Sequence, residues 1–98
     1  MDRKRIMNDI ETLLDVMLTK IDADAELLFL KGNLTQSKNK VLNAERGMRL
    51  ELHAKGMARQ VYDNFWDTKD IYYDLVALDA LQDKFNQSVE PIGKMELQ

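Results

Sequence analysis

The chain has no cysteine, one histidine, one proline and four glycines in 98 residues. Without cysteine it can form neither a disulfide nor a thiolate zinc site, which fits a reducing compartment. Proline and glycine, the strongest helix breakers, are scarce, while leucine, methionine, lysine, glutamate, aspartate and alanine are frequent. This composition favours a helical protein.

A long apolar run is also missing. The first seven residues are basic, but Asp9, Glu11 and Asp15 follow them at once, so the start is neither a signal peptide nor a membrane span. We therefore expect a cytoplasmic protein with no membrane partner. We also expect one domain, 1–98, whose core is small enough that a second copy would add to it materially.

Residues typical of catalysis are scarce as well. His53 is the only histidine, and it falls on the polar side of a helical pattern, where a histidine is usually solvated. No serine stands in a nucleophile elbow, and Gly47 and Gly56 are too far apart to form a phosphate loop. We expect no enzyme activity, no cofactor and no bound metal.

Apolar residues recur at three- and four-residue steps over the first third of the chain, which is the spacing of one helix face. They are Ile6, Ile10, Leu13, Leu14, Met17, Ile21 and Leu28. Gly32 and Asn33 tolerate a left-handed backbone, so together they form a good helix stop. The pattern predicts a helix over residues 3–31, about 40 Å long given the helical rise per residue.

The middle of the chain supports two interpretations. Residues 48–54 alternate apolar and polar side chains between two glycines, which is a strand pattern. On a helical wheel, residues 41–66 instead separate into a polar arc and a wide apolar arc. We favour one helix over 36–66, because a lone strand would have no partner. Glu51 and Lys55 intrude on the apolar arc of this helix, but as (i, i+4) neighbours they can neutralise each other.

The last third of the chain predicts a helix over 68–89. Asp67 or Thr68 can cap its start, and Pro91 ends it because the residue before a proline avoids the helical region. No glycine or proline separates this helix from the preceding one, so the two could also be continuous. Residues 90–98 form a short tail.

The net charge of −3 hides an uneven distribution: residues 31–60 carry +5 and residues 61–98 carry −5. In the basic stretch, Arg46, Arg49 and His53 share one face of the expected second helix and could contact phosphates. However, no helix-turn-helix signature is present and the pI is about 5.1. We therefore expect this stretch to pair with the acidic helices and do not expect nucleic acid as a partner.

The acidic third of the chain contains a row of aspartates, here called the aspartate stripe. It consists of Asp63, Asp67, Asp70 and Asp74, at i, i+4, i+7 and i+11. Such a row can be a solvated helix face, hold a hard divalent cation, or imitate a phosphate backbone. The cation alternative requires Glu-x-x-Glu or Glu-x-x-His elements, and the sequence has neither. The stripe is our first candidate binding surface, and the basic face just described is the alternative.

Aromatic residues gather where the second and third helices are expected to meet. They are Tyr62, Phe65, Trp66, Tyr72 and Tyr73. Most should pack as core, but Tyr73 lies on the side of its helix opposite Leu78 and Phe85. Since tyrosine and tryptophan are the commonest interface anchors, we add Tyr73 to the candidate surface.

We expect an all-α fold in which a long antiparallel hairpin, 3–31 against 36–66, is completed by the third helix into a three-helix bundle. The third helix is too short to cover the other two, so we expect a homodimer. For function, we expect a non-enzymatic module that binds an unidentified protein, an adaptor or regulator of the kind found among bacterial and phage accessory proteins. The alternatives are an inhibitor that mimics nucleic acid through the aspartate stripe, and a metal-dependent nucleotide hydrolase.

Overall fold

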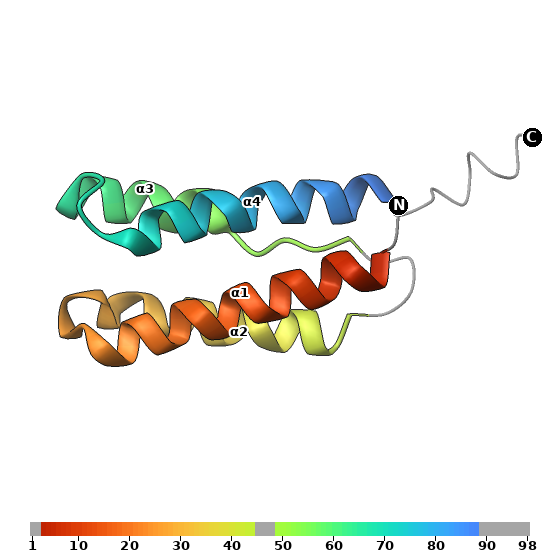
Figure 1. Ribbon diagram of the computed structural model, residues 1–98, viewed down its shortest axis with the longest axis horizontal. Coiled ribbons are helices and arrows are strands. Elements are labelled where there is room, and N and C mark those ends of the chain that lie inside the picture. The colour runs from red at the N-terminus through yellow and green to blue at the C-terminus, as the bar shows by residue number, and fades with distance from the viewer. Residues whose placement is uncertain (1–2, 45–48, 89–98) are drawn as a thin grey trace, which may run out of the picture.

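The computed structural model describes residues 3–44 and 49–88, and within these ranges the protein is all-α with no strand. The elements are, in chain order, the α-helix α1 (Arg3–Ala23), the 3-10 helix η1 (Ala25–Leu30), and the α-helices α2 (Lys31–Leu42), α3 (Ala54–Phe65) and α4 (Asp70–Ser88) (Figure 1). In the described part of the chain, no helix is both long and apolar enough to cross a membrane.

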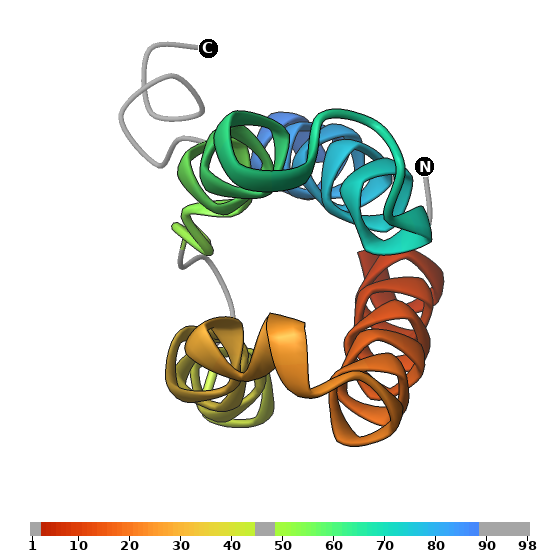
Figure 2. The ribbon, with the colours of Figure 1, turned by 90° about the vertical axis from the view of Figure 1, so that its left-hand side faces the viewer.

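The helices form two antiparallel hairpins that lie side by side. α1 and α2 make one hairpin, joined through η1, and α3 and α4 make the other (Figure 1). α1 packs against α4, so Figure 2 shows an arc in the order α2, α1, α4, α3. Both hairpin turns lie at the same end of the molecule, the left end of Figure 1. The expected single long hairpin is therefore replaced by two shorter ones.

The first helix has the predicted core face but ends earlier than predicted. Every buried residue of α1 belongs to the predicted apolar face; these are Ile6, Ile10, Leu14, Met17 and Ile21. At Asp24 the backbone leaves the helix (φ −138°, ψ 101°), and the carboxylate accepts a hydrogen bond from the Glu26 amide at 3.1 Å. Aspartate is a strong N-cap residue, and here it starts η1.

The helix over 3–31 is thus wrong at its C-terminal end, and so is the predicted stop. Gly32 and Asn33 lie within the first turn of α2 rather than beyond the end of a helix. The chain reverses instead through η1, where Leu27 and Leu30 are buried. The N-cap at Asp24 thus ends α1, although apolar residues continue at helical spacing beyond it.

The predicted helix over 36–66 is also wrong, because residues 49–53 are not helical. Leu50 and Leu52 are buried, whereas Arg49, Glu51 and His53 between and beside them are exposed. The alternating pattern of the sequence therefore describes an extended segment, which runs along the molecule before α3 begins (Figure 1).

Side chains of α4 take the place of a partner strand for this segment. The Asn86 amide group both accepts from the Leu50 amide N–H (2.8 Å) and donates to the Leu50 carbonyl (2.9 Å). Gln82 Oε1 accepts from the Leu52 N–H at 2.6 Å. A side-chain amide carries the same donor and acceptor groups as the backbone, so it can satisfy buried peptide groups as a strand would.

The helix α2 contacts the same segment from the other side. Ser37, which is buried, donates to the Leu52 carbonyl at 3.2 Å, and Lys40 donates to the Glu51 carbonyl at 3.0 Å. Our argument that a lone strand would have no partner overlooked these side chains. The segment therefore bridges α2 and α4, which are not neighbours in the arc.

The second hairpin turns sharply between α3 and α4, so these helices are not continuous. Trp66 closes α3 with a positive φ of 57°, and its N–H donates to the Tyr62 carbonyl at 2.7 Å. Thr68 then donates its hydroxyl to the Phe65 carbonyl. α4 begins at Asp70 and ends at Ser88, close to the predicted 68–89, while the tail 90–98 lies outside the described residues.

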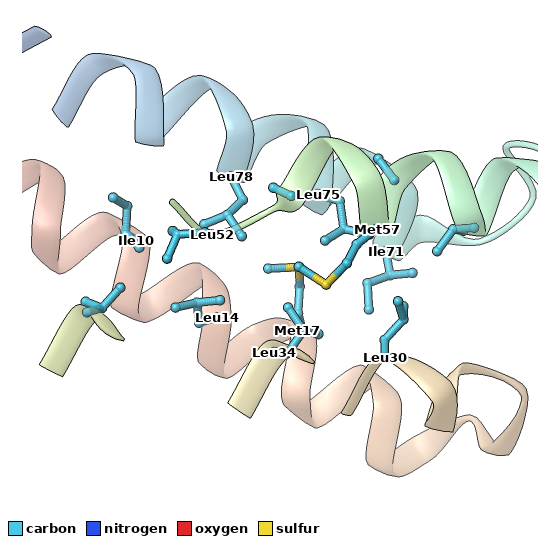
Figure 3. Packing of buried hydrophobic residues seen from close by; sticks show 14 of the residues in the cluster. Ile10, Leu14, Met17, Leu30, Leu34, Leu52, Met57, Ile71, Leu75 and Leu78 are labelled. Carbon is cyan, nitrogen blue, oxygen red and sulfur yellow. The ribbon is translucent and has the colours of Figure 1, made fainter. Parts of the chain in front are cut away.

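One hydrophobic core joins all the elements. In Figure 3, Ile10, Leu14 and Met17 of α1 lie opposite Leu75 and Leu78 of α4. The same cluster also contains Leu30, Leu34, Leu50, Leu52, Met57, Val61, Ile71 and Phe85. Since the extended segment contributes two leucines to this cluster, it is part of the core and not a surface loop.

Candidate functional site

The outer surface of the α3–α4 hairpin carries a row of four aromatic rings, of which Tyr72 is partly buried and the other three are exposed. The ring centroid of Tyr62 lies 5.9 Å from that of Trp66 and 5.5 Å from that of Tyr72, which lies 5.3 Å from that of Tyr73. Trp66 is 68% exposed, Tyr73 55% and Tyr62 44%. We call these four residues the aromatic row. Its exposure is unusual for rings of this size, which normally bury most of their surface.

A groove of about 340 Å³ lies between α3 and α4 beside the aromatic row. It is lined by Lys55, Ala58, Arg59 and Tyr62 of α3 and by Tyr72, Val76 and Asp79 of α4. The two tyrosines, Ala58 and Val76 make its lining mostly apolar. Val76 is itself 48% exposed. The apolar surface thus continues from the aromatic row into the groove.

Sequence reasoning missed the groove, although the signal was present. Lys55, Arg59, Tyr62 and Trp66 stand at i, i+4, i+7 and i+11, the spacing of one face of a helix. In the predicted helix over 36–66, Lys55 would instead pair with Glu51. That pair is absent because Glu51 belongs to the extended segment and not to α3.

The groove ends in two cations that form no ion pair with any described residue. Lys55 and Arg59 are exposed and make no ion pair within residues 3–44 and 49–88. Asp79 lines the same part of the groove and offsets one of these charges. This end of the hairpin therefore presents a small positive surface next to apolar side chains.

The opposite end of the hairpin is acidic. Asp63 of α3, Asp67 of the turn and Asp70 of α4 are all exposed there. Tyr73 donates its hydroxyl to Asp67 Oδ2 at 3.2 Å, which raises the pKa of the phenol because the carboxylate favours its neutral form. Tyr73 is exposed as predicted, and it links the aromatic row to the acidic end.

The aspartate stripe does not form a continuous row. The chain reverses between Asp63 and Asp70, so helical spacing holds only for Asp70 and Asp74 on α4. Asp74 is partly buried and forms an ion pair with Lys20 of α1. The prediction of four carboxylates on consecutive turns of a helix is therefore wrong, although three of them gather around one turn.

Lys69, the cation of that turn, faces away from these aspartates. Its Nζ lies 2.9 Å from Asp24 Oδ2 and 2.9 Å from Glu26 Oε1, both at the turn of the other hairpin. These contacts raise the pKa of Lys69, and the hydrogen bond to Lys69 lowers the pKa of Asp24. The charge of Lys69 is thus used to join the two turns and does not neutralise the acidic end.

The alternative basic face is not present as predicted. Arg46 lies outside the described residues, and Arg49 and His53 belong to the extended segment instead of a helix. Both side chains are exposed, with the exposed Glu51 between them. His53 has a left-handed backbone (φ 57°) and immediately precedes α3. The expected helical face is wrong at Arg49 and His53, because residues 49–53 are not helical.

Among the described residues, no group of three His, Cys, Asp or Glu side chains could hold a metal ion. No family model, curated protein or solved structure matches the chain. The outer face of the α3–α4 hairpin is the best-defined candidate site.

Proposed function

We propose that the protein is a non-enzymatic protein-binding module, an adaptor or regulator in the cytoplasm, and that the outer face of the α3–α4 hairpin is its binding surface. The observation that carries the proposal is a mostly apolar groove next to an indole that is 68% exposed. Interfaces are enriched in tryptophan and tyrosine, which act as anchors when a partner removes water from them.

The exposed rings of this surface can contribute part of the free energy of binding a partner. An aromatic side chain buries about 150–250 Å² on full burial, and apolar area contributes about 25 cal/mol per Å². Covering the exposed two-thirds of Trp66 would therefore contribute roughly 3 kcal/mol before the costs of association. Tyr62, Tyr73 and Val76 lie on the same hairpin and would add to this.

The described residues favour the binding of a protein through apolar anchors over the mimicry of a nucleic acid. A mimic needs a regular row of free carboxylates, but Asp74 is paired with Lys20 and the other three lie around a turn. The aromatic row beside these carboxylates suits a protein surface with apolar anchors.

A tagged protein added to lysate of the cells that produce it tests the proposal, with captured proteins identified by mass spectrometry. The variant Trp66→Ser with Tyr73→Ser removes the two most exposed rings of the row. The control variant Val16→Ser with Leu42→Ser removes two exposed apolar side chains from α1 and α2. Circular dichroism must show both variants folded.

We expect the control variant to retain the partners of the wild-type protein, a second copy of this chain included, and the Trp66/Tyr73 variant to lose them. Equal retention by both variants, or no protein retained by the wild type, would contradict the proposal.

A further inference from the structure

We propose that the partner at this face is a second copy of the chain, and that two copies pair about a two-fold axis with the Trp66 indole of each in the α3–α4 groove of the other. This rests on the proposed function of the face. It adds the identity of the occupant and the orientation in which it binds.

The first argument is that the projecting Trp66 indole and the α3–α4 groove lie on the same face of α3. Arg59 lines the groove and Trp66 follows seven residues later, so the two lie roughly 10 Å apart along α3. In a two-fold interface each copy presents the same patch, so a projection and a recess on that patch fill each other twice. The groove of about 340 Å³ is near the lower end of the roughly 300–1,000 Å³ of ligand pockets, which suits one large side chain.

The second argument is that the backbone of Trp66 is fixed and its ring already contacts Tyr62 before binding. Trp66 is the residue at which α3 ends, its N–H is bonded to the Tyr62 carbonyl, and its ring contacts the Tyr62 ring. A non-glycine residue at φ 57° is uncommon and is kept there by its surroundings. A side chain fixed in its bound orientation loses less entropy on association.

The third argument is charge complementarity between the two ends of the face. An axis that exchanges Trp66 with the groove passes near Tyr62, the residue of this stripe that lies between Arg59 and Trp66, and places the copies antiparallel. The Lys55–Arg59 end of each copy then meets the Asp67–Asp70 end of the other. Both cations make no ion pair within the described residues, and Lys69 is turned away from the acidic end, so both charged ends are available. A parallel arrangement would bring like charges together, which is unfavourable.

Charge reversal at each end separates this dimer from other occupants. One variant carries Lys55→Glu with Arg59→Glu, and the other Asp67→Lys with Asp70→Lys. The control, Lys31→Glu with Arg49→Glu, changes the net charge as much as the first variant does. It removes only the exposed pair of Lys31 with Asp22, and such a pair contributes little. Sedimentation equilibrium at micromolar concentration measures the association of each.

We expect the wild type and the control to sediment at twice 11.4 kDa. Each reversal variant alone should raise the dimer dissociation constant by at least about 100-fold, because like charges then meet at both ends. An equimolar mixture of the two should form a heterodimer, since one copy is acidic at both ends and the other basic at both. Trp66 is the only tryptophan, so dissociation on dilution should also shift fluorescence emission to longer wavelength.

A wild-type protein that stays at 11.4 kDa would overturn the proposed dimer. Reversal variants that associate as tightly as the wild type would also overturn it, as would a mixture of the two folded variants that forms no heterodimer. If the wild type is monomeric but still captures another protein through Trp66 and Tyr73, the binding face is retained and the occupant is a foreign protein. If the variant without Trp66 and Tyr73 captures the same proteins as the wild type, the proposed function fails as well.

Discussion

The two hairpins share one core but differ in how the charges on their surfaces are paired. In the first hairpin, Lys20, Lys31 and Lys38 each form an ion pair with an aspartate. In the second, Lys55 and Arg59 make none within the described residues. Six of the seven aromatic residues also belong to the second hairpin or its turn, and only Phe29 lies before it. Lys31 and Lys38 pair within the first hairpin and Lys20 pairs with Asp74 of the second, whereas Lys55 and Arg59 leave positive charge exposed beside apolar side chains of the second hairpin.

The strongest test of this comparison asks whether the shared core makes the hairpins one folding unit. Leu14 of α1 and Leu75 of α4 are both fully buried. Leu14→Ala and Leu75→Ala should each lower the free energy of unfolding by about 2–5 kcal/mol, because each leaves a cavity in the same cluster. Urea denaturation followed by circular dichroism should give a single transition for both.

Val16→Ala, at an exposed position of α1, serves as the control. It should lower the free energy of unfolding by much less than the core variants do. Two separate transitions, or a large loss at Leu14 with none at Leu75, would show that the hairpins fold independently.

A smaller effect is expected where α4 holds the extended segment. Asn86→Ala leaves the Leu50 N–H and carbonyl without their partner, and an unsatisfied buried group costs about 1–3 kcal/mol. The free energy of unfolding should fall by that amount, measured by urea denaturation. Gln87→Ala, one residue on and exposed, should change it by less than about 0.5 kcal/mol. Equal effects of the two variants would mean that the Asn86 amide does not stabilise the segment.

The smallest effect concerns the link between the aromatic row and the acidic end. Since Asp67 raises the pKa of Tyr73, phenolate should form at higher pH than in an ordinary tyrosine. Asp67→Asn should move this pKa back toward 10.0, measured by NMR titration of the tyrosine rings, while Asp63→Asn should leave it in place. A folded-state pKa above the unfolded value stabilises the fold below the unfolded pKa, and that contribution is lost as pH rises through the folded value. A Tyr73 titration unchanged by Asp67→Asn would contradict the hydrogen bond.

The spacing of apolar residues was sufficient to predict those parts of the fold where a single helix face packs on the core. The buried face of α1 and the limits of α4 followed from apolar spacing and from Pro91. The break at Asp24 and the extended residues 49–53 did not, because each depends on hydrogen bonds to particular side chains. The hydrogen bonds of Asn86 and Gln82 to the segment span 36 and 30 residues, and no local pattern encodes them.

The candidate site was predicted in part. The exposure of Tyr73 followed from its position opposite the core face of its helix. The groove did not, because it requires α3 and α4 to be antiparallel neighbours, and we had left open that they were continuous. The pairing of Asp74 with Lys20 depends on the contact between α1 and α4, which the sequence does not reveal either.

The side-chain anchoring of the extended segment also has a consequence for the order of folding. Each hairpin consists of contacts between neighbours in sequence, which form quickly, whereas Asn86 must find Leu50 across 36 residues. The segment can dock only after α4 has formed, and it then contacts α2 as well. We therefore expect its docking on α4 to come late, after the main barrier. Substitutions in it should leave the folding rate nearly unchanged and act by speeding unfolding, so this segment sets the lifetime of the native state.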